Sequence, residues 1–359
     1  MSNRVDSSDA LDGSPAGVLA PTASLVPQSG WKRSSAAHRF FGSRETQLAL
    51  VIVVIFIAIT IYKPNFASRD NIQFLLLESV VLGLVAVGQT FVILTKGIDL
   101  AVAPILGLTA VITGLIASHS GLSIGAAIVL AIVLGVMLGA INGLLVVIAR
   151  IPPIIATLGT LGLFGGFQFL YTNGDQVSQV PNDFDYFGNG QVLPWIPMPV
   201  LILVVVTAAA AVCLKWTRFG RNIMAVGNNE HASRVAGVRV RWIIFSTYVI
   251  SGALAGFAGL VYVAHTAAAT AVTGTSDNYQ LQSIAAALIG GTLISGGRGN
   301  VFGSVLASVF LTLTLTCMVF LGIPAIWNFG GQGLLILAAL ALEGRERSTV
   351  PTGTRGRAK

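Results

Sequence analysis

Side chains that could catalyse a reaction or bind a metal ion are few in this sequence and are not grouped. The four histidines are far apart, and no H-E-x-x-H pair or Ser, His and Asp set is present. A G-x-x-x-x-G-K-S/T phosphate loop, a common element for binding and hydrolysing ATP, is also missing. We therefore predict a protein that is not an enzyme, with no catalytic residues, no metal ligands and no cofactor on this chain.

Polar side chains are found instead within long apolar stretches. Glu78 lies near one end of such a stretch, where it either faces water or pairs with a neighbour. Asp99 lies at the edge of another, close to Lys96 and near the start of an expected helix, where an aspartate is favourable. Uncharged polar residues in these stretches either bond neighbouring helices or line a path for a neutral, hydroxyl-rich solute such as a sugar. The candidates for that lining are Gln89, Thr90, Asn142, Gln168, Gln282 and Asn328.

The composition explains why these polar residues stand out. Of 359 residues, 54% are hydrophobic and 10% are charged, and the mean hydropathy is +0.81. A soluble globular chain has about 25% charged residues. These values exclude a soluble enzyme, a disordered protein and a collagen-like chain, and they predict a polytopic membrane protein.

Apolar stretches long enough to cross a bilayer follow one another along the chain. A transmembrane helix needs about 20 mostly apolar residues, and the stretch 100–149 is long enough for two. We expect an all-α fold with about ten transmembrane helices, although eight would fit the charge pattern as well. The eighth stretch ends in a cluster of glycines and could instead be a re-entrant or broken helix. The expected spans are 46–62, 72–95, 99–117, 122–149, 154–172, 194–214, 243–265, 281–295, 299–320 and 324–342.

The basic residues indicate how these helices are oriented. All of the 21 Lys and Arg residues except Lys63 and Arg69 fall on one side when the spans are threaded in order. Cytoplasmic loops carry such an excess, so we expect both termini to be cytoplasmic. Residues 1–45 are predicted to form a disordered cytoplasmic tail rather than a signal peptide. The membrane domain then covers 46–342, and 343–359 form a basic cytoplasmic tail.

Glycines recur every four residues in several spans, a spacing that lets helix backbones approach closely. The spacing alone does not distinguish packing within one chain from packing between two copies, and we expect the former. A weak similarity between 90–103 and 290–303 also fits an internal repeat, which is common in transporters. The glycine stripes are formed by Gly135, Gly139 and Gly143, by Gly252 and Gly256, and by Gly121 and Gly125.

The longest expected cytoplasmic loop, residues 215–242, has the features of a docking element. It holds six basic residues and one acid, Glu230. Asn228 or Asn229 can cap a helix, Glu230 suits its first turn, and Gly237 can end it. We therefore predict a two-turn helix between basic flanks, as a docking site for another protein would require.

Five motifs in a fixed order give the chain a family resemblance. They are Gly88–Thr90 with Gly97–Leu100, Asn142-Gly143 with Ile151–Gly159, Gly220–Gly237, Ser251–Gly259, and Ala285–Gly303. This series resembles the membrane permease subunits of bacterial ATP-binding-cassette importers for monosaccharides, in a superfamily that also contains branched-chain amino acid permeases. The resemblance covers about residues 47–342, with Lys96 in place of the family's Gly and His231 in place of an acid or small residue.

The resemblance implies partners and roles that the composition does not. In this family, two permease copies form the pathway, cytoplasmic ATPase subunits use ATP and Mg²⁺, and an extracytoplasmic binding protein delivers the solute. The chain would then be one half of a homodimer in the bacterial inner membrane, with no nucleic-acid partner. Gly97 and Asp99 would form a motif turn. The ATPase would contact Asn229, Glu230, Ala232, Ser233, Arg234 and Gly237.

Other functions stay open at this stage. The same architecture could import a nucleoside, a cyclitol, a quorum signal or an amino acid. A self-sufficient secondary transporter is a second alternative, and a structural membrane scaffold is a third. Sparse ionisable residues within the spans argue against an ion-driven transporter.

Overall fold

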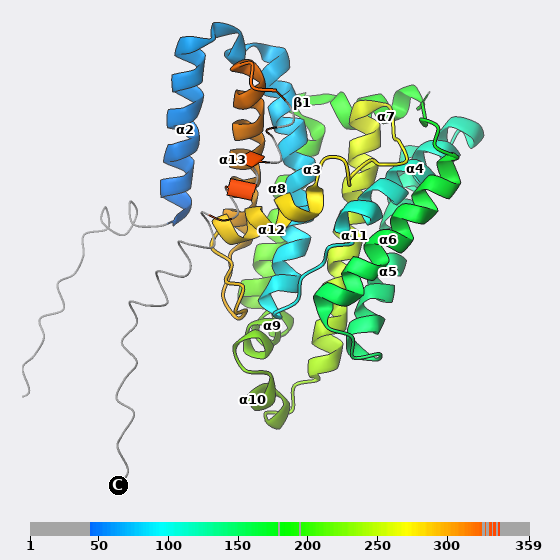
Figure 1. Ribbon diagram of the computed structural model, residues 1–359, viewed down its shortest axis with the longest axis vertical. Helices are drawn as coiled ribbons and strands as arrows, with labels where there is room; N and C mark the ends of the chain where they lie inside the picture. The colour runs from blue at the N-terminus through cyan, green and yellow to red at the C-terminus, as the bar shows by residue number, and fades with distance from the viewer. Residues whose placement is uncertain are drawn as a thin grey trace, which may run out of the picture.

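The chain folds into a bundle of long helices, shown as a computed structural model in Figure 1. The structure describes residues 44–178, 180–193 and 195–324, together with scattered positions from 327 to 337. Within that part, the strands are β1 (Gln191–Leu193) and β2 (Ile196–Pro197), which form one antiparallel hairpin. The predicted all-α polytopic fold is confirmed.

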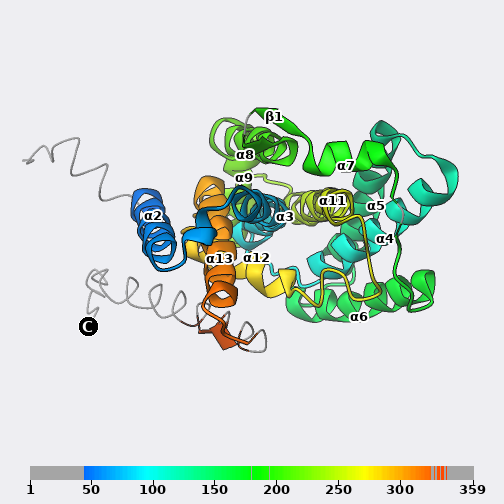
Figure 2. The same ribbon diagram turned by 90° about the horizontal axis from the view of Figure 1, so that it is seen from above.

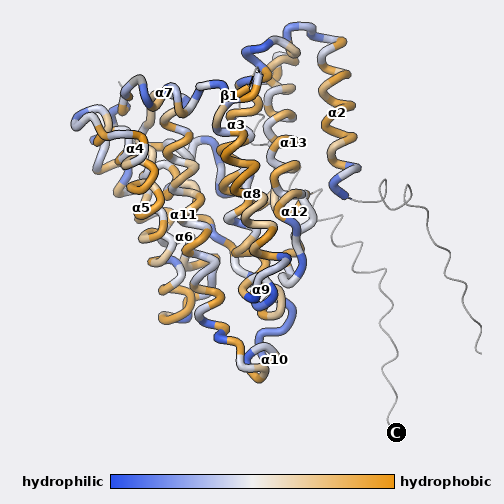
Figure 3. Tube along the Cα trace, turned by 180° about the vertical axis from the view of Figure 1, so that it is seen from behind, coloured by the Kyte–Doolittle hydropathy of each residue, from blue (hydrophilic) through white to orange (hydrophobic). Residues whose placement is uncertain are grey.

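Eight of the helices in the described part are long and apolar enough to cross a membrane. Hydrophobic colour follows them from end to end in Figure 3, while hydrophilic residues gather at the turns and on the short helices. The eight are α2 (Arg44–Tyr62), α3 (Arg69–Leu94), α4 (Val102–Ser120), α5 (Ile124–Val147), α6 (Pro153–Thr172), α8 (Met198–Trp216), α11 (Val240–Thr266) and α13 (Val301–Phe320).

Shorter helices lie between these spans. One pair, α9 (Arg218–Asn228) and α10 (Glu230–Val235), occupies the predicted docking loop, where the sequence predicted a single helix. A surface helix, α7 (Asn182–Asn189), forms part of the segment that connects α6 to α8. The remaining short elements are a 3₁₀ turn, η1 (Pro64–Ala67), and α12 (Tyr279–Ile289).

The expected span at 281–295 is wrong as a full crossing. Its helix, α12, has 11 residues, which at about 1.5 Å per residue is roughly half the thickness of the hydrocarbon core. The helix ends where Gly290 packs against the backbone of Gly303 and Gly291 takes a φ of +94°. An irregular segment then leads to α13, which matches the re-entrant alternative.

Several predictions fall outside the described residues. The tail up to residue 43 and the basic C-terminal tail 343–359 lie there, and so does Asn328. Most of the expected tenth span, 324–342, also lies there. The described part contains eight helices of sufficient length, and the expected tenth span stays a prediction.

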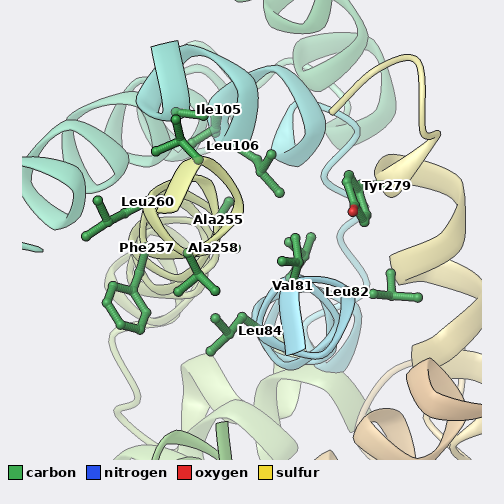
Figure 4. Close-up of a cluster of buried hydrophobic side chains, with 14 of the residues drawn as sticks. Val81, Leu82, Leu84, Ile105, Leu106, Ala255, Phe257, Ala258, Leu260 and Tyr279 are labelled. Atoms are coloured by element: carbon green, nitrogen blue, oxygen red, sulfur yellow. The ribbon is translucent and has the colours of Figure 1, made fainter. Parts of the chain in front are cut away.

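Helices α3 and α11 form the centre of the bundle. Seen from above in Figure 2, they lie between α8 on one side and α4 and α6 on the other. Val81 and Leu84 of α3 and Ala255 and Ala258 of α11 belong to one buried cluster, which Figure 4 shows in close-up. Burial of these side chains against other protein, rather than lipid, makes α3 and α11 the frame on which the other helices pack.

The glycine stripes bring α5 and α11 into backbone contact. A Cβ on Gly139 would collide with the Tyr248 carbonyl and with the backbone of Gly252, and one on Gly135 would collide with Gly252 and Gly256. This confirms the expected packing within one chain for these two stripes. The Gly121 and Gly125 pair differs, because no atom among the described residues lies within 4 Å of a Cβ built on either one.

The two segments with the suspected repeat lie side by side. The N–H of Gly297 donates to the carbonyl of Leu94 at 2.9 Å. The hydroxyls of Thr90 and Ser304 are 2.8 Å apart. The irregular turn after α3 and the irregular segment before α13 therefore support one another at the same end of the bundle.

We predict that Gly139→Leu strongly destabilises the protein, because the colliding atoms belong to the backbone of α11 and cannot move aside. The cost should lie at or above the upper end of the roughly 1–3 kcal/mol typical of overpacking. Thermal unfolding of the purified protein in detergent measures it. Gly125→Leu, in the same helix but facing open space, is the matched control, and an equal loss of stability in both variants would contradict the packing.

Candidate functional site

The short helix α10 protrudes from one end of the bundle in Figure 1. Asn229 caps it, because its side-chain oxygen accepts from the N–H of Ala232 at 3.0 Å. Gly237 ends it with a φ of +81°, and the N–H of Gly237 donates to the carbonyl of Arg234 at 3.1 Å. The predicted helix, its cap and its end are confirmed.

All side chains of α10 except that of Ser233 are exposed. Ser233 is buried, whereas Ala232 and Val235 are exposed, the latter by 78%. Arg234 and Glu230 form an exposed ion pair of 2.6 Å. An exposed apolar side chain on a short helix held by defined caps is a surface suited to docking by another protein.

Helix α9 fixes α10 to the membrane domain. The hydroxyl of Thr217 accepts from the N–H of Gly220 and caps α9, and Ile223 and Val226 bury its apolar face. Gly227 lies so close to Leu94 and Gly297 that a Cβ there would collide with their backbones. Through α9, α10 is thus connected to the end of α3 and to the segment before α13.

Basic side chains gather at this end of the bundle. A cavity of about 540 Å³ lies between α5, α10 and α11, and Lys96, Arg150, Arg234 and Arg241 all contribute to its wall. Glu230 is the acid in the same wall. The concentration of positive charge agrees with the excess that the sequence assigned to one side of the membrane.

A second feature is the buried turn between α3 and α4, which centres on Asp99. One carboxylate oxygen accepts from the N–H of Ala101 at 3.0 Å and from the amide of Asn142 at 3.4 Å. The other accepts from the Ser251 hydroxyl at 3.1 Å. The side chain is fully buried, so the carboxylate joins the turn to α5 and α11 in the interior of the bundle.

Gln89 holds the backbone of the same turn. With its amide oriented by its neighbours, the nitrogen donates to the Asp99 carbonyl and the oxygen accepts from the Asp99 N–H, both at 3.2 Å. Lys96 takes a φ of +65° in this turn. Gly97 packs against Tyr248, where a Cβ would lie 2.6 Å from the hydroxyl. A Cβ at position 97 would therefore displace the side chains of Tyr248 and Val92.

The network extends to α6. Thr160 donates to the side-chain oxygen of Asn142 at 2.6 Å, and Thr157 donates to the carbonyl of Ile98 at 3.1 Å. The side-chain oxygen of Asn142 and both oxygens of the Asp99 carboxylate thus have partners from other parts of the bundle. Such satisfaction is required of polar groups in the interior of a membrane protein.

The other predicted lining residues have separate positions. Thr90 bonds Ser304 across to α13. The amide nitrogen of Gln168 donates to the carbonyls of Thr270 and Thr273. Gln282 lines a groove at the opposite end from α10. The structure therefore places Gln89 and Asn142 together and the other three apart from them, and the lining role stays a prediction.

This groove is the third feature, and it has a volume of about 650 Å³ between α3, α12 and α13. Glu78 lies well inside α3, and its carboxylate accepts a 3.0 Å hydrogen bond from the Tyr279 hydroxyl. Glu78 therefore pairs with a residue of another helix that is distant in the sequence, and it lines the groove, whose contact with water stays a prediction. The polar side chains of the wall are Asn71, Glu78, Ser276, Asp277, Asn278, Tyr279, Gln282, Thr312 and Thr316.

The loop before α12 adds a second carboxylate to the groove. Burial raises the pKa of the Asp277 carboxyl above its usual value. One of its oxygens is buried with no hydrogen-bond partner among the described residues. Asp277, Tyr279, Thr312 and Thr316 are not among the lining residues predicted from the sequence, although the two threonines are polar residues within an expected span.

These three features define a class of protein. A bundle of spanning helices with a polar groove toward one end, and a short exposed helix at a cationic other end, has the architecture of a membrane transport subunit. The chain belongs to the family described as the permease component of the branched-chain amino acid transport system, whose model matches residues 71–340. It is a multi-pass protein of the inner membrane.

Individual relatives are similar over most of the chain. The ribose import permease RbsC of Bacillus subtilis is 36% identical over 297 residues, which are 82% of this chain and 91% of the relative. The autoinducer 2 permease LsrC of Photorhabdus luminescens is 33% identical over 308 residues, 86% of this chain and 92% of the relative. The LsrC protein of Yersinia pestis is 33% identical over 313 residues, 87% of this chain and 88% of the relative. No solved structure is significantly similar to the chain.

We predict that Asp99→Ala destabilises the protein by about 3 kcal/mol or more. The change leaves the Ala101 N–H, the Asn142 amide and the Ser251 hydroxyl without their acceptor, and each such group costs about 1–3 kcal/mol when buried. Asp99→Asn should cost far less because it keeps one acceptor and the shape of the side chain. Thermal unfolding in detergent separates the two, with the exposed Asp175→Ala as control. Equal stability of the Ala and Asn variants would contradict the network.

Proposed function

We propose that this chain is the permease subunit of an ATP-driven importer for a monosaccharide or a similarly hydroxylated small solute. The geometry of α10 is the observation that supports it best. A short exposed helix, rigidly capped and fixed through α9 to the ends of two spans, is what a separate ATPase would need to move the membrane domain. The chain itself carries no phosphate loop, so the proposal assigns ATP and Mg²⁺ to that partner.

Orientation follows from charge. The positive-inside rule assigns the cationic end, with Lys96, Arg150 and the α9–α10 region, to the cytoplasm. The groove at Glu78 then faces the opposite side, where a binding protein would release its solute. Both termini are cytoplasmic in this proposal.

The groove also supports a second copy of the chain. Carboxylate, amide and hydroxyl groups inside a span do not face lipid, and they line water or meet other protein. The wall at α3, α12 and α13 opens at the exposed side chains of Phe74 and Val319. A second permease copy covering this face would enclose a polar path between the two, as the resemblance implies.

The cargo class comes from the relatives and from the chemistry of the groove. Two of the relatives bear names for the import of ribose and autoinducer 2. Uncharged hydroxyls and amides, such as those of Thr312, Thr316 and Gln282, suit a hydroxyl-rich solute. A branched-chain amino acid, suggested by the family description, is the alternative cargo, and the ligand of the partner binding protein would decide between them.

We predict that Arg234→Glu abolishes docking of the ATPase without unfolding the permease. The Arg234–Glu230 pair is exposed, so its loss costs at most about 1 kcal/mol of stability, while the reversed charge faces any partner on α10. The measurement is the amount of ATPase subunit that co-purifies with the tagged chain from its native host in a gentle detergent. We expect a decrease of roughly tenfold or more.

Arg218→Glu, on exposed α9 at the same end, carries the same charge change and is the control. Deletion of 228–237 should reproduce the loss. Normal co-purification and normal solute uptake in the Arg234→Glu variant would contradict the docking role. Uptake by this chain alone, abolished by collapse of the ion gradient, would instead support a secondary transporter.

We also predict that the groove contains water. In a background with Cys213→Ala and Cys317→Ala, a Gln282→Cys variant should react with a membrane-impermeant thiol reagent added from outside. Leu163→Cys is the control, since Leu163 is 53% exposed on α6 but would face lipid, where the reactive thiolate does not form. Labelling of the control and protection of Gln282→Cys would contradict a watery path at α12.

A further inference from the structure

A groove at the cationic end has an apolar floor and a basic rim, a combination suited to binding an amphiphile. It has a volume of about 670 Å³ and lies between the last turn of α5 and the start of α11. It is separate from the outer groove at Glu78. The docking helix α10 contributes one side chain, Arg234, to its rim.

The floor of this groove is apolar. It is formed by Leu144 and Val147 of α5, by Ile148 directly after α5, and by Val240 and Phe245 of α11. Exposed apolar side chains continue the floor along one face of α5, in the series Met137, Ile141, Leu144 and Ile148. At about 1.5 Å per residue this stripe is roughly 16 Å long, and it leads from the groove toward the middle of the span.

The rim of the groove is basic. Arg239 and Arg241 are both exposed and lie at the start of α11. Neither has an acidic side chain within ion-pair distance in the part of the chain that the structure describes, whereas Arg234 is paired with Glu230. A ligand that enters the groove over this rim therefore meets two guanidinium groups with no acidic partner among the described residues.

A tryptophan stands between the two parts. Trp242 is 61% exposed and its ring stacks on Phe245 with 5.4 Å between centroids. Exposed tryptophan at the end of a span is typical of the boundary between lipid tails and headgroups. The groove thus lies at headgroup depth, with its cationic rim toward water and its apolar track toward the hydrocarbon.

We infer that this groove is a specific site for an anionic phospholipid. One acyl chain lies along the α5 stripe, and the phosphate is held by Arg239 and Arg241 at the rim. Basic pockets between helices on the cytoplasmic side of a membrane are suited to such headgroups. A zwitterionic lipid would neutralise its own phosphate and leave the two arginines without a counter-charge.

Other occupants fit the groove less well. A second copy docked about a two-fold axis would bring the same arginines of both chains together. A cytoplasmic ATPase could reach the rim, but it would not cover the stripe from Ile148 to Met137, which runs into the bilayer. One phospholipid molecule can place its phosphate at the basic rim and an acyl chain along the apolar stripe.

Native mass spectrometry of the full-length protein tests the site. The protein is purified in a mild detergent and titrated with phosphatidylglycerol or phosphatidylcholine of the same acyl length. Three variants are compared with the wild type. The double variant Arg239→Gln, Arg241→Gln removes the rim charge, Leu144→Trp fills the apolar floor at unchanged charge, and the double variant Lys215→Gln, Arg218→Gln removes two basic residues that do not line the groove.

We expect the wild type to prefer phosphatidylglycerol by roughly tenfold or more, at about 1 kcal/mol for each arginine near the headgroup. The rim variant and Leu144→Trp should each lose that preference, and the Lys215 and Arg218 variant should keep it. Equal loss in both charge variants would reduce the effect to general surface charge and overturn the site. Binding unchanged by Leu144→Trp, or a changed dimer fraction with unchanged lipid adducts, would also overturn it.

Discussion

The structure depends on one constraint: a polar group inside a membrane domain must find its partner within the protein. The chain leaves the helix at Leu94 and does not resume it until Val102, which frees backbone groups in the interior. Gln89 and the Asp99 carboxylate compensate for this break, the first by pairing with the backbone of Asp99 and the second by joining α5 and α11. The backbone can leave the helical conformation here because side chains supply hydrogen bonds in place of the missing helical ones.

Close packing makes those bonds possible. Ser251 reaches Asp99 because α11 lies against both α3 and α5, and the glycines of α5 and α11 allow the two backbones to touch. A larger side chain at Gly139 would separate the helices and lengthen the bonds from Asn142 and Ser251 together. The small residues and the polar residues of the bundle are thus parts of one arrangement, although they belong to different motifs.

The sequence contains enough information to predict the long helices and the short helix α10. Apolar length predicts spans, and the Asn229 cap and the Gly237 end define α10 from local chemistry alone. The short α12 was ambiguous because a glycine cluster fits both a span end and a break within it. Local patterns do not reveal which side chains meet. Glu78 and Tyr279 are separated by 201 positions, and the pairing of Gln89 with the Asp99 backbone depends on a turn whose path is set by α11.

The Asp99 turn and α10 are connected through the structure on both sides of α10. α10 is joined on one side to α9, whose Gly227 touches the backbone at Leu94 and Gly297. On its other side it continues into α11, which carries Tyr248 against Gly97 and Ser251 against Asp99. α10 is therefore connected to the Asp99 turn by two separate routes. The turn itself is held by hydrogen bonds to four helices rather than by a continuous helix, so its path depends on how α3, α5, α6 and α11 pack together.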